Sequence, residues 1–88
     1  MIHEYKINPI YFHAMKHGLK SFDIRQKDSE REPVNVGDEI LFLEFDIKTN
    51  KYTTRKLLCL VTYILVGSNF TVLEEDYFIM SLKILDYN

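Results

Sequence analysis

The chain has 88 residues, of which 47% are hydrophobic and 27% charged, and its formal net charge is −2. This composition excludes collagen-like and low-complexity chains and predicts a single small folded domain over residues 1–88. A slightly acidic protein lacks the basic excess needed to grip long nucleic acid by its phosphates, so any nucleic-acid binding must be local.

The chain begins with an alternating segment that predicts a strand over residues 2–7. Asn8 and Pro9 then have the residue types of a helix N-cap and first helical position, and Gly18 fits the left-handed residue that ends a helix. The core face of this short helix is predicted at Tyr11, Ala14 and Met15.

A second strand is predicted over residues 20–25, with Phe22 and Ile24 on one face. A charge-rich loop is predicted over residues 26–35. The later elements are strands over 39–45 and 77–85, a hairpin connection over 46–51, a long strand or bent pair over 52–66, and a turn over 67–69.

One helix among about five or six strands with short turns favours an α+β fold, a small mixed barrel with the helix packed against it. Residues 57–65 are apolar on both faces, which is typical of a strand covered on both sides.

Polar side chains gather where the helix gives way to the second strand. Residues 18–25 bring together an ammonium, a hydroxyl, a carboxylate and a guanidinium, a set that can bind a phosphate or a planar polar ligand. An exposed strand face with an Asp23–Arg25 ion pair is the alternative. The four side chains are Lys20, Ser21, Asp23 and Arg25.

Three segments, His3-Glu4-Tyr5-Lys6-Ile7, Gly18-x-Lys20-x-Phe22-Asp23-Ile24-Arg25 and Val36-Gly37-Asp38, together resemble the ASCH domains of the PUA-like superfamily, including small bacterial and phage members. The resemblance implies a PUA-like pseudobarrel with a cleft beside the helix, in which family members are proposed to bind RNA or nucleotides. It implies that Lys20 and Arg25 contact phosphate or base-edge acceptors and that Asp23, often Glu in the family, accepts from an amino group or orients Arg25.

The same resemblance implies an alternative, because some small ASCH proteins resemble amidohydrolases that deacylate N4-acetylcytidine. Their lysine matches Lys20, but Asp23 stands where they carry a threonine, and a carboxylate is a poor substitute for a hydroxyl nucleophile. Ser21 is the nearby hydroxyl, and Glu74 or Glu75 could supply the distant carboxylate. A binding module is therefore favoured over an enzyme.

Two further side chains are candidates for ligand contact, although a structural role is favoured for both. His3 lies in the family-like first strand, where a structural hydrogen bond is the favoured role, and Tyr52 could be a stacking platform or a packing residue. A third hypothesis is a homodimer that pairs through the apolar strand over 57–66 or through an exposed edge.

No metal, cofactor or membrane partner is expected. His13 and His17 have the spacing of a metal-binding pair but no third ligand, so both are predicted to face solvent. Cys59 is alone in the chain and is predicted to be a small buried hydrophobe. No apolar run approaches the roughly 20 residues of a membrane span, and no secretion signal is visible, so a cytoplasmic location is expected.

Overall fold

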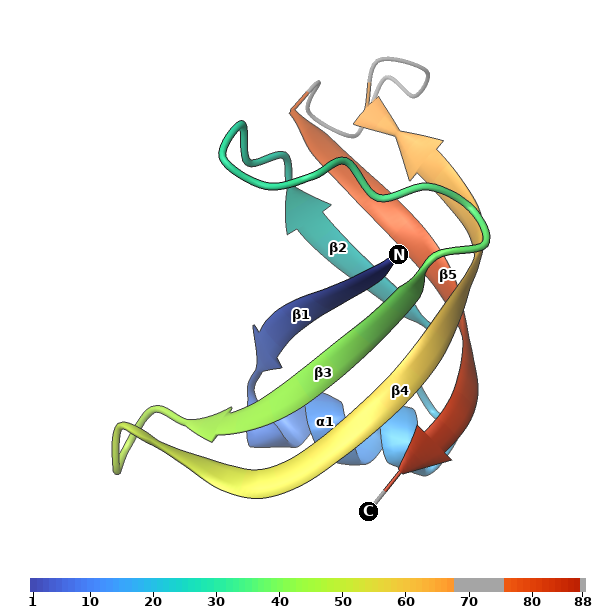
Figure 1. The fold of residues 1–88 in the computed structure, drawn as a ribbon. Coiled ribbons are helices and arrows are strands. Elements are labelled where there is room, and N and C mark those ends of the chain that lie inside the picture. Colours follow the sequence, from blue (N-terminus) through green and yellow to red (C-terminus); the bar gives the residue numbers. More distant parts are fainter. Residues whose placement is uncertain (68–75, 88) are drawn as a thin grey trace.

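The computed structural model describes residues 1–67 and 76–87, in which one short helix packs against a curled five-stranded sheet (Figure 1). The elements are β1 (Ile2–Ile7), α1 (Pro9–Lys16), β2 (Phe22–Gln26), β3 (Glu39–Asp46), β4 (Lys51–Val66) and β5 (Tyr77–Tyr87). Residues 68 and 69 of the turn predicted over 67–69 lie outside the described residues. No helix in the described ranges has the length and apolar character that crossing a bilayer would need.

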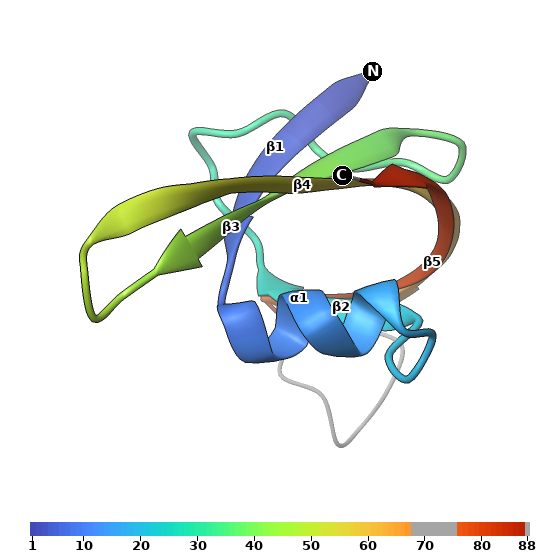
Figure 2. The same cartoon turned by 90° about the horizontal axis from the view of Figure 1, so that it is seen from below.

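The strands lie in the order β1-β3-β4-β5-β2, so β1 and β2 form the two edges of the sheet. β1 runs parallel to β3, with His3 beside Ile40, and every other neighbouring pair is antiparallel. The sheet curls until its two edges face each other across an open side, and α1 lies across one end of the curl (Figure 2). The predicted α+β class and small mixed barrel are confirmed.

Of the two predicted alternatives, a long strand or a bent pair, β4 is one continuous strand, and its pairing contains irregularities. Its register with β5 shifts between Leu58 and Cys59 and again between Val61 and Tyr63. Such bulges increase local twist and help a sheet to curl. Over residues 57–60, β4 pairs with β3 on one side and β5 on the other, so this stretch offers no free edge to a second copy.

The helix begins and ends where the sequence predicts, and Met15 of its predicted core face is buried, but Phe12 takes the buried position expected for Tyr11. The Asn8 side chain accepts a hydrogen bond from the Ile10 amide, and Gly18 adopts a φ of 76° after the last turn. Phe12 is completely buried, whereas Tyr11 is 53% exposed. Tyr11 and Phe12 are both aromatic and adjacent, so the helical period alone could not select the buried one, and the expected role of Tyr11 in the core is wrong.

Alternate residues of the strands complete a single core beneath the helix. Burial, with a smaller contribution from the charge of Asp23, raises the pKa of the Cys59 thiol to about 11, so the thiol stays protonated at neutral pH and packs as a hydrophobe. The fully buried members are Phe12, Met15, Ile40, Phe42, Leu57, Cys59, Val61 and Met80.

Phe12→Ala should lower the free energy of unfolding by about 3–5 kcal/mol, because it removes a buried ring and leaves a cavity between α1 and the sheet. Ile10→Ala on the exposed face of the same helix is the matched control and should change it by less than about 0.5 kcal/mol. Urea unfolding followed by circular dichroism measures both. Equal losses would place the helix in a different rotation.

Candidate functional site

The polar face of β2 points into the molecule. Asp23 is only 7% exposed, whereas its neighbours Phe22 and Ile24 are 44% and 47% exposed. The predicted alternation of the strand is therefore correct, and the interpretation of its polar face as an exposed surface is wrong. A buried carboxylate is tolerated only when charged or hydrogen-bonding partners compensate for its lost hydration.

Asp23 has a cation on each carboxylate oxygen. Lys20 Nζ donates to Oδ1 at 3.1 Å and Arg25 Nε donates to Oδ2 at 2.6 Å. Lys20 Nζ also donates to the Phe22 carbonyl oxygen at 2.8 Å. These charge-assisted bonds offset the desolvation of Asp23 and hold both basic side chains in place. The sequence-predicted group of Lys20, Asp23 and Arg25 is thus brought together as an ion triad.

The two cations of this triad open onto different hollows. Lys20, with Gly18 and Ser21, lines a small hollow of about 190 Å³ at the end of α1. Arg25 lines a separate hollow of about 580 Å³ between the sheet edges. The expectation that one cleft beside the helix contains the whole segment is therefore wrong, because the Asp23 carboxylate lies between the two cations and separates them.

We call the gap between the facing edges of β1 and β2 the seam. Two arginines bridge this open side of the sheet. Arg25 Nη2 donates to the Lys6 carbonyl oxygen at 3.0 Å. Arg31, in the loop after β2, donates through Nη1 to the Glu4 carbonyl oxygen at 2.8 Å. Both acceptors belong to the unpaired edge of β1, so the guanidinium groups supply donors that a neighbouring strand would otherwise provide.

Aromatic rings pack against the cations of the seam. The guanidinium carbons of Arg25 and Arg31 lie 4.6 and 4.5 Å from the centroid of the Tyr5 ring. Lys6 Nζ lies 4.4 Å from the centroid of the Phe45 ring. Cation–π contacts at such distances restrain the cations without neutralising their charge. The 580 Å³ hollow of the seam is lined by Glu4, Tyr5, Lys6, Arg25, Arg31, Leu43 and Tyr52.

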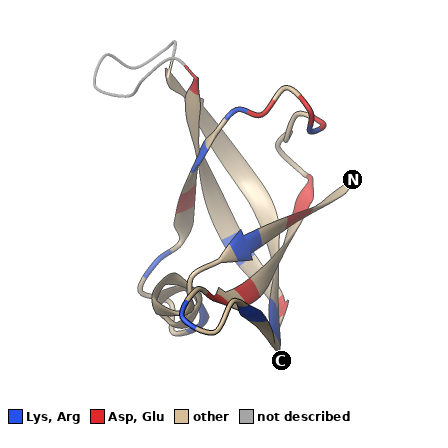
Figure 3. Cartoon of the chain, turned by 90° about the vertical axis from the view of Figure 1, so that its left-hand side faces the viewer, with Lys and Arg blue, Asp and Glu red and all other residues tan. Residues whose placement is uncertain are grey.

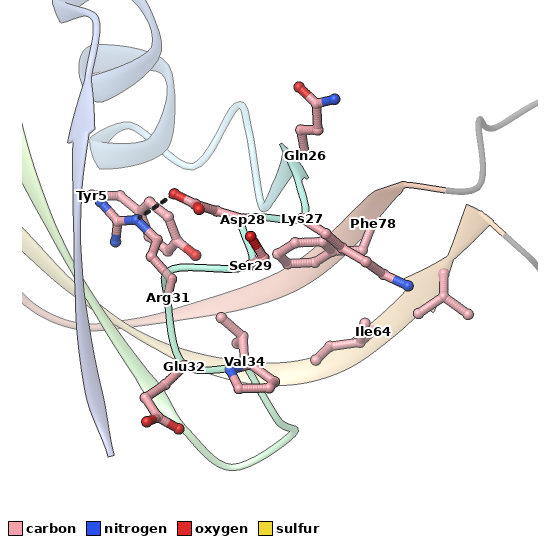
Figure 4. Close-up of a pocket in the computed structure, with 12 residues that line it drawn as sticks. Tyr5, Gln26, Lys27, Asp28, Ser29, Arg31, Glu32, Val34, Ile64 and Phe78 are labelled. Carbon is pink, nitrogen blue, oxygen red and sulfur yellow. Dashed lines mark ion pairs between the residues drawn. The ribbon is translucent and has the colours of Figure 1, made fainter.

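A larger and more apolar hollow of about 710 Å³ adjoins the first, and both are lined by Tyr5 and Arg31 (Figure 4). Its wall consists of the loop after β2 on one side and the sheet on the other, where Ile64 and Phe78 lie. Arg31 is steadied here by Asp28, with Nε 3.8 Å from Oδ2. The resemblance implied that residues 29–35 reshape a rim of the cleft beside the helix, and the structure instead places part of this loop on the 710 Å³ hollow.

The remaining predicted site residues lie apart from one another. Tyr52 lines the seam and packs edge-to-face against Phe45, with ring centroids 5.0 Å apart. Ser21 is exposed and lines only the small hollow at the end of α1. Glu74 and Glu75 lie outside the described residues, so the structure does not place the distant carboxylate of the deacylase hypothesis.

His3 is structural, as the sequence favoured. Its Nε2 lies 2.9 Å from Asp38 Oδ2, and both Asn35 and the N-terminal amine also direct N–H groups to this carboxylate. These contacts, with the His3 hydrogen bond the largest, lower the pKa of Asp38 to about 2. The cluster ties the chain start to the turn before β3 and lines none of the hollows described here.

Sequence reasoning missed a second buried carboxylate, Glu44 of β3. Its Oε1 accepts hydrogen bonds from Arg55 Nε at 2.6 Å and from the Thr53 hydroxyl, and its Oε2 lies 3.5 Å from His13 Nε2. Burial raises the pKa of Glu44, but the Arg55 and Thr53 bonds outweigh it and hold the pKa below its usual range. An alternating strand gives no pattern that distinguishes a buried glutamate from an exposed one.

His13 and His17 are both exposed, as the sequence predicts, and their rings also make contacts within the fold. His13 contacts Glu44 and stacks on His17, with ring centroids 6.5 Å apart. Over residues 1–67 and 76–87 no group of three or more His, Cys, Asp and Glu side chains is arranged to hold a metal ion.

Basic and acidic residues interleave along the chain, so the basic character of the seam is a local feature (Figure 3). Together these observations define a small α+β domain whose curled sheet is closed by arginines rather than by strand pairing. The chain belongs to the family described as a domain of unknown function, DUF3850, whose sequence profile matches residues 2–82. No curated protein matches it.

Asp23→Asn should lower the free energy of unfolding by about 1.5–3 kcal/mol, because an amide cannot replace a carboxylate between two cations. Asp86→Asn on the exposed end of β5 is the matched control and should have little effect. Chemical denaturation at neutral pH measures both. Equal stabilities for the two variants would contradict the structural role of the ion triad.

Acid should weaken the fold partly through Asp38. Because its folded pKa of about 2 lies below the ordinary value of 3.8, its contribution is fully present above about pH 4 and is lost as the pH falls toward 2. The Asp38→Asn variant should therefore lose less stability than the parent between pH 4 and pH 2 in urea titrations at several pH values. Parallel pH profiles for the two proteins would contradict this role.

Proposed function

We propose that the seam binds a nucleotide-like ligand, either free or as part of RNA. One observation carries the proposal: Arg25 and Arg31 are both held against Tyr5 and both line the same 580 Å³ hollow, which also contains Lys6. Three cations around one hollow of this size match the charge and dimensions of a phosphate-bearing small ligand.

The donors of the two guanidinium groups are only partly used. A guanidinium carries five N–H groups, and Arg25 uses Nε for Asp23 and Nη2 for the Lys6 carbonyl. The remaining N–H groups can form the paired hydrogen bonds by which arginine recognises phosphate. Because the side chain is already immobilised, little conformational entropy is lost when the ligand binds.

The surroundings of the cations suit the rest of a nucleotide. Tyr52, at the border of the seam, is 51% exposed and offers a ring face for base stacking. The adjoining 710 Å³ hollow has an apolar wall at Val34, Ile64 and Phe78, where a base could be shielded from water. A phosphate held at the arginines would place the base within reach of either surface.

The resemblance to ASCH domains supports the same ligand class, but the hydrogen bonds of the ion triad change the roles of two residues. Arg25 keeps its proposed role in contacting phosphate or base-edge acceptors. Lys20 and Asp23 instead become positioning residues, because Asp23 holds Arg25 and Lys20 holds Asp23. In this proposal Ser21 and His3 no longer contact the ligand.

Deacylation of an N4-acetylcytidine-like nucleoside has weaker support. Both oxygens of Asp23 accept hydrogen bonds from cations, which leaves this carboxylate poorly suited to attack an amide. Among the described residues, Ser21 is the only hydroxyl on the hollow that Lys20 lines, and it is exposed to water. The binding experiment described below also tests for deacylation.

Arg31→Gln should weaken binding of a nucleoside monophosphate by about 1.5–3 kcal/mol, which raises Kd roughly ten- to 150-fold, because it removes charge-assisted bonds to the phosphate. Arg31 is the better choice than Arg25 because its ion partner, Asp28, is exposed. Lys83→Gln, on an exposed position of β5, is the matched control and should leave Kd unchanged. Isothermal titration calorimetry measures both.

Amide NMR spectra recorded with nucleoside monophosphates, N4-acetylcytidine and inorganic phosphate locate the ligand. We expect shifts at Tyr5, Lys6, Arg25 and Arg31, with phosphate alone producing a subset of them. Shifts confined to residues 18–21, with deacetylated product in the tube, would favour the deacylase. A spectrum that no nucleotide perturbs would contradict the proposed function.

A further inference from the structure

Two further hollows adjoin the hollow of the seam. The 580 Å³ hollow of the seam and the apolar 710 Å³ hollow are both lined by Tyr5 and Arg31. On the other side, Glu4, Leu43 and Tyr52 line both the seam and a third hollow of about 240 Å³. We call the seam hollow and this third hollow together the seam groove.

The third hollow lies where β3 and β4 lose their regular pairing. Leu43 pairs with Lys56 and Phe45 with Tyr52, so three residues of β4 stand opposite the single residue Glu44. Thr54, in this bulge, has a φ of 76°, a left-handed conformation that is strained for a β-branched side chain. The bulge places Thr54, Arg55 and Lys56 together along the hollow.

The charge of the groove is strongly one-sided despite the acidic balance of the chain. Five basic side chains and two acidic ones line the seam and the third hollow. One of the two acids, Glu44, is fully buried and bonded to Arg55. The basic residues are Lys6, Arg25, Arg31, Arg55 and Lys56.

The arrangement of these cations extends beyond the needs of one nucleotide. Arg25 and Arg31 lie in the seam, and Arg55 and Lys56 lie in the next hollow along, with Tyr52 at the border of both. Cations that follow a groove past an exposed aromatic ring are typical of proteins that bind single-stranded nucleic acid, in which the cations track successive phosphates and the ring stacks a base.

We propose that the seam groove binds a single-stranded oligonucleotide of more than one nucleotide, whose backbone runs from the seam into the third hollow. This inference rests on the proposed function, since it assigns the same arginines to one phosphate of the ligand. It adds that Lys56 contacts a second phosphate, while Tyr52 stacks on the base between the two. A free mononucleotide would occupy only the seam.

The test compares uridine monophosphate with uridine oligomers of two, four and six nucleotides by calorimetry at several salt concentrations. We expect affinity to rise at least tenfold from the monomer to the tetramer. The slope of log affinity against log salt should become steeper by about 0.7 for each added phosphate contact. Matching thymidine oligomers show whether a 2′-hydroxyl contributes.

The Lys56→Gln variant distinguishes binding in the third hollow from binding in the seam. It should reduce tetramer affinity severalfold and its salt slope by about 0.7, and it should leave monophosphate binding unchanged. Tyr52→Leu should weaken the tetramer more than the monophosphate, because it removes a stacking surface. Lys83→Gln is again the control, and an unchanged amide spectrum confirms that each variant is folded.

The outcomes distinguish this inference from the proposed function. If the monophosphate binds as tightly as the tetramer, or Lys56→Gln affects both equally, the extended groove is wrong and the seam remains a nucleotide site. If neither monomer nor oligomer of either sugar binds, both the inference and the proposed function are overturned.

Discussion

The contact between the two sheet edges at the open side of this molecule depends on the ion triad that the Asp23 carboxylate forms with Lys20 and Arg25. Without this carboxylate, the ammonium of Lys20 and the guanidinium of Arg25 would repel each other near the buried face of β2. With it, Arg25 is fixed so that its outer nitrogen reaches the Lys6 carbonyl oxygen at the edge of β1. A side-chain contact thereby joins the first and last strands of the sheet, which do not pair through their backbones.

Closing a sheet with arginines has consequences that strand pairing would not have. A paired edge is continuous and leaves no room for a ligand, whereas the guanidinium groups of Arg25 and Arg31 leave hollows on either side of Tyr5. The same groups cover the exposed carbonyls of β1 and so protect an edge that could otherwise recruit another strand. Edge protection and the proposed ligand binding would therefore use the same cations, which is why we place the proposed site at the seam.

Much of the fold follows from local patterns, and the site follows from them only in part. Alternation and turn residues predicted each strand to within a few positions, and Asn8 and Gly18 marked the ends of α1. Periodicity could not choose between Tyr11 and Phe12, nor show that the polar side of β2 faces inward, because both depend on how distant elements pack. Arg31 lies in a loop without periodicity, so nothing local indicated that it would reach the edge of β1.

The acidic balance of the whole chain and the basic character of the seam are compatible because the cations act at short range. At physiological ionic strength, charges more than roughly 8 Å apart are largely screened, so a ligand in the groove responds chiefly to the side chains that line it. Distant acids reduce the attraction for long duplexes, which cannot enter hollows between strand edges. Such a protein would have low affinity for bulk nucleic acid while still binding a short segment that fits the groove, so geometry, more than net charge, would determine what it binds.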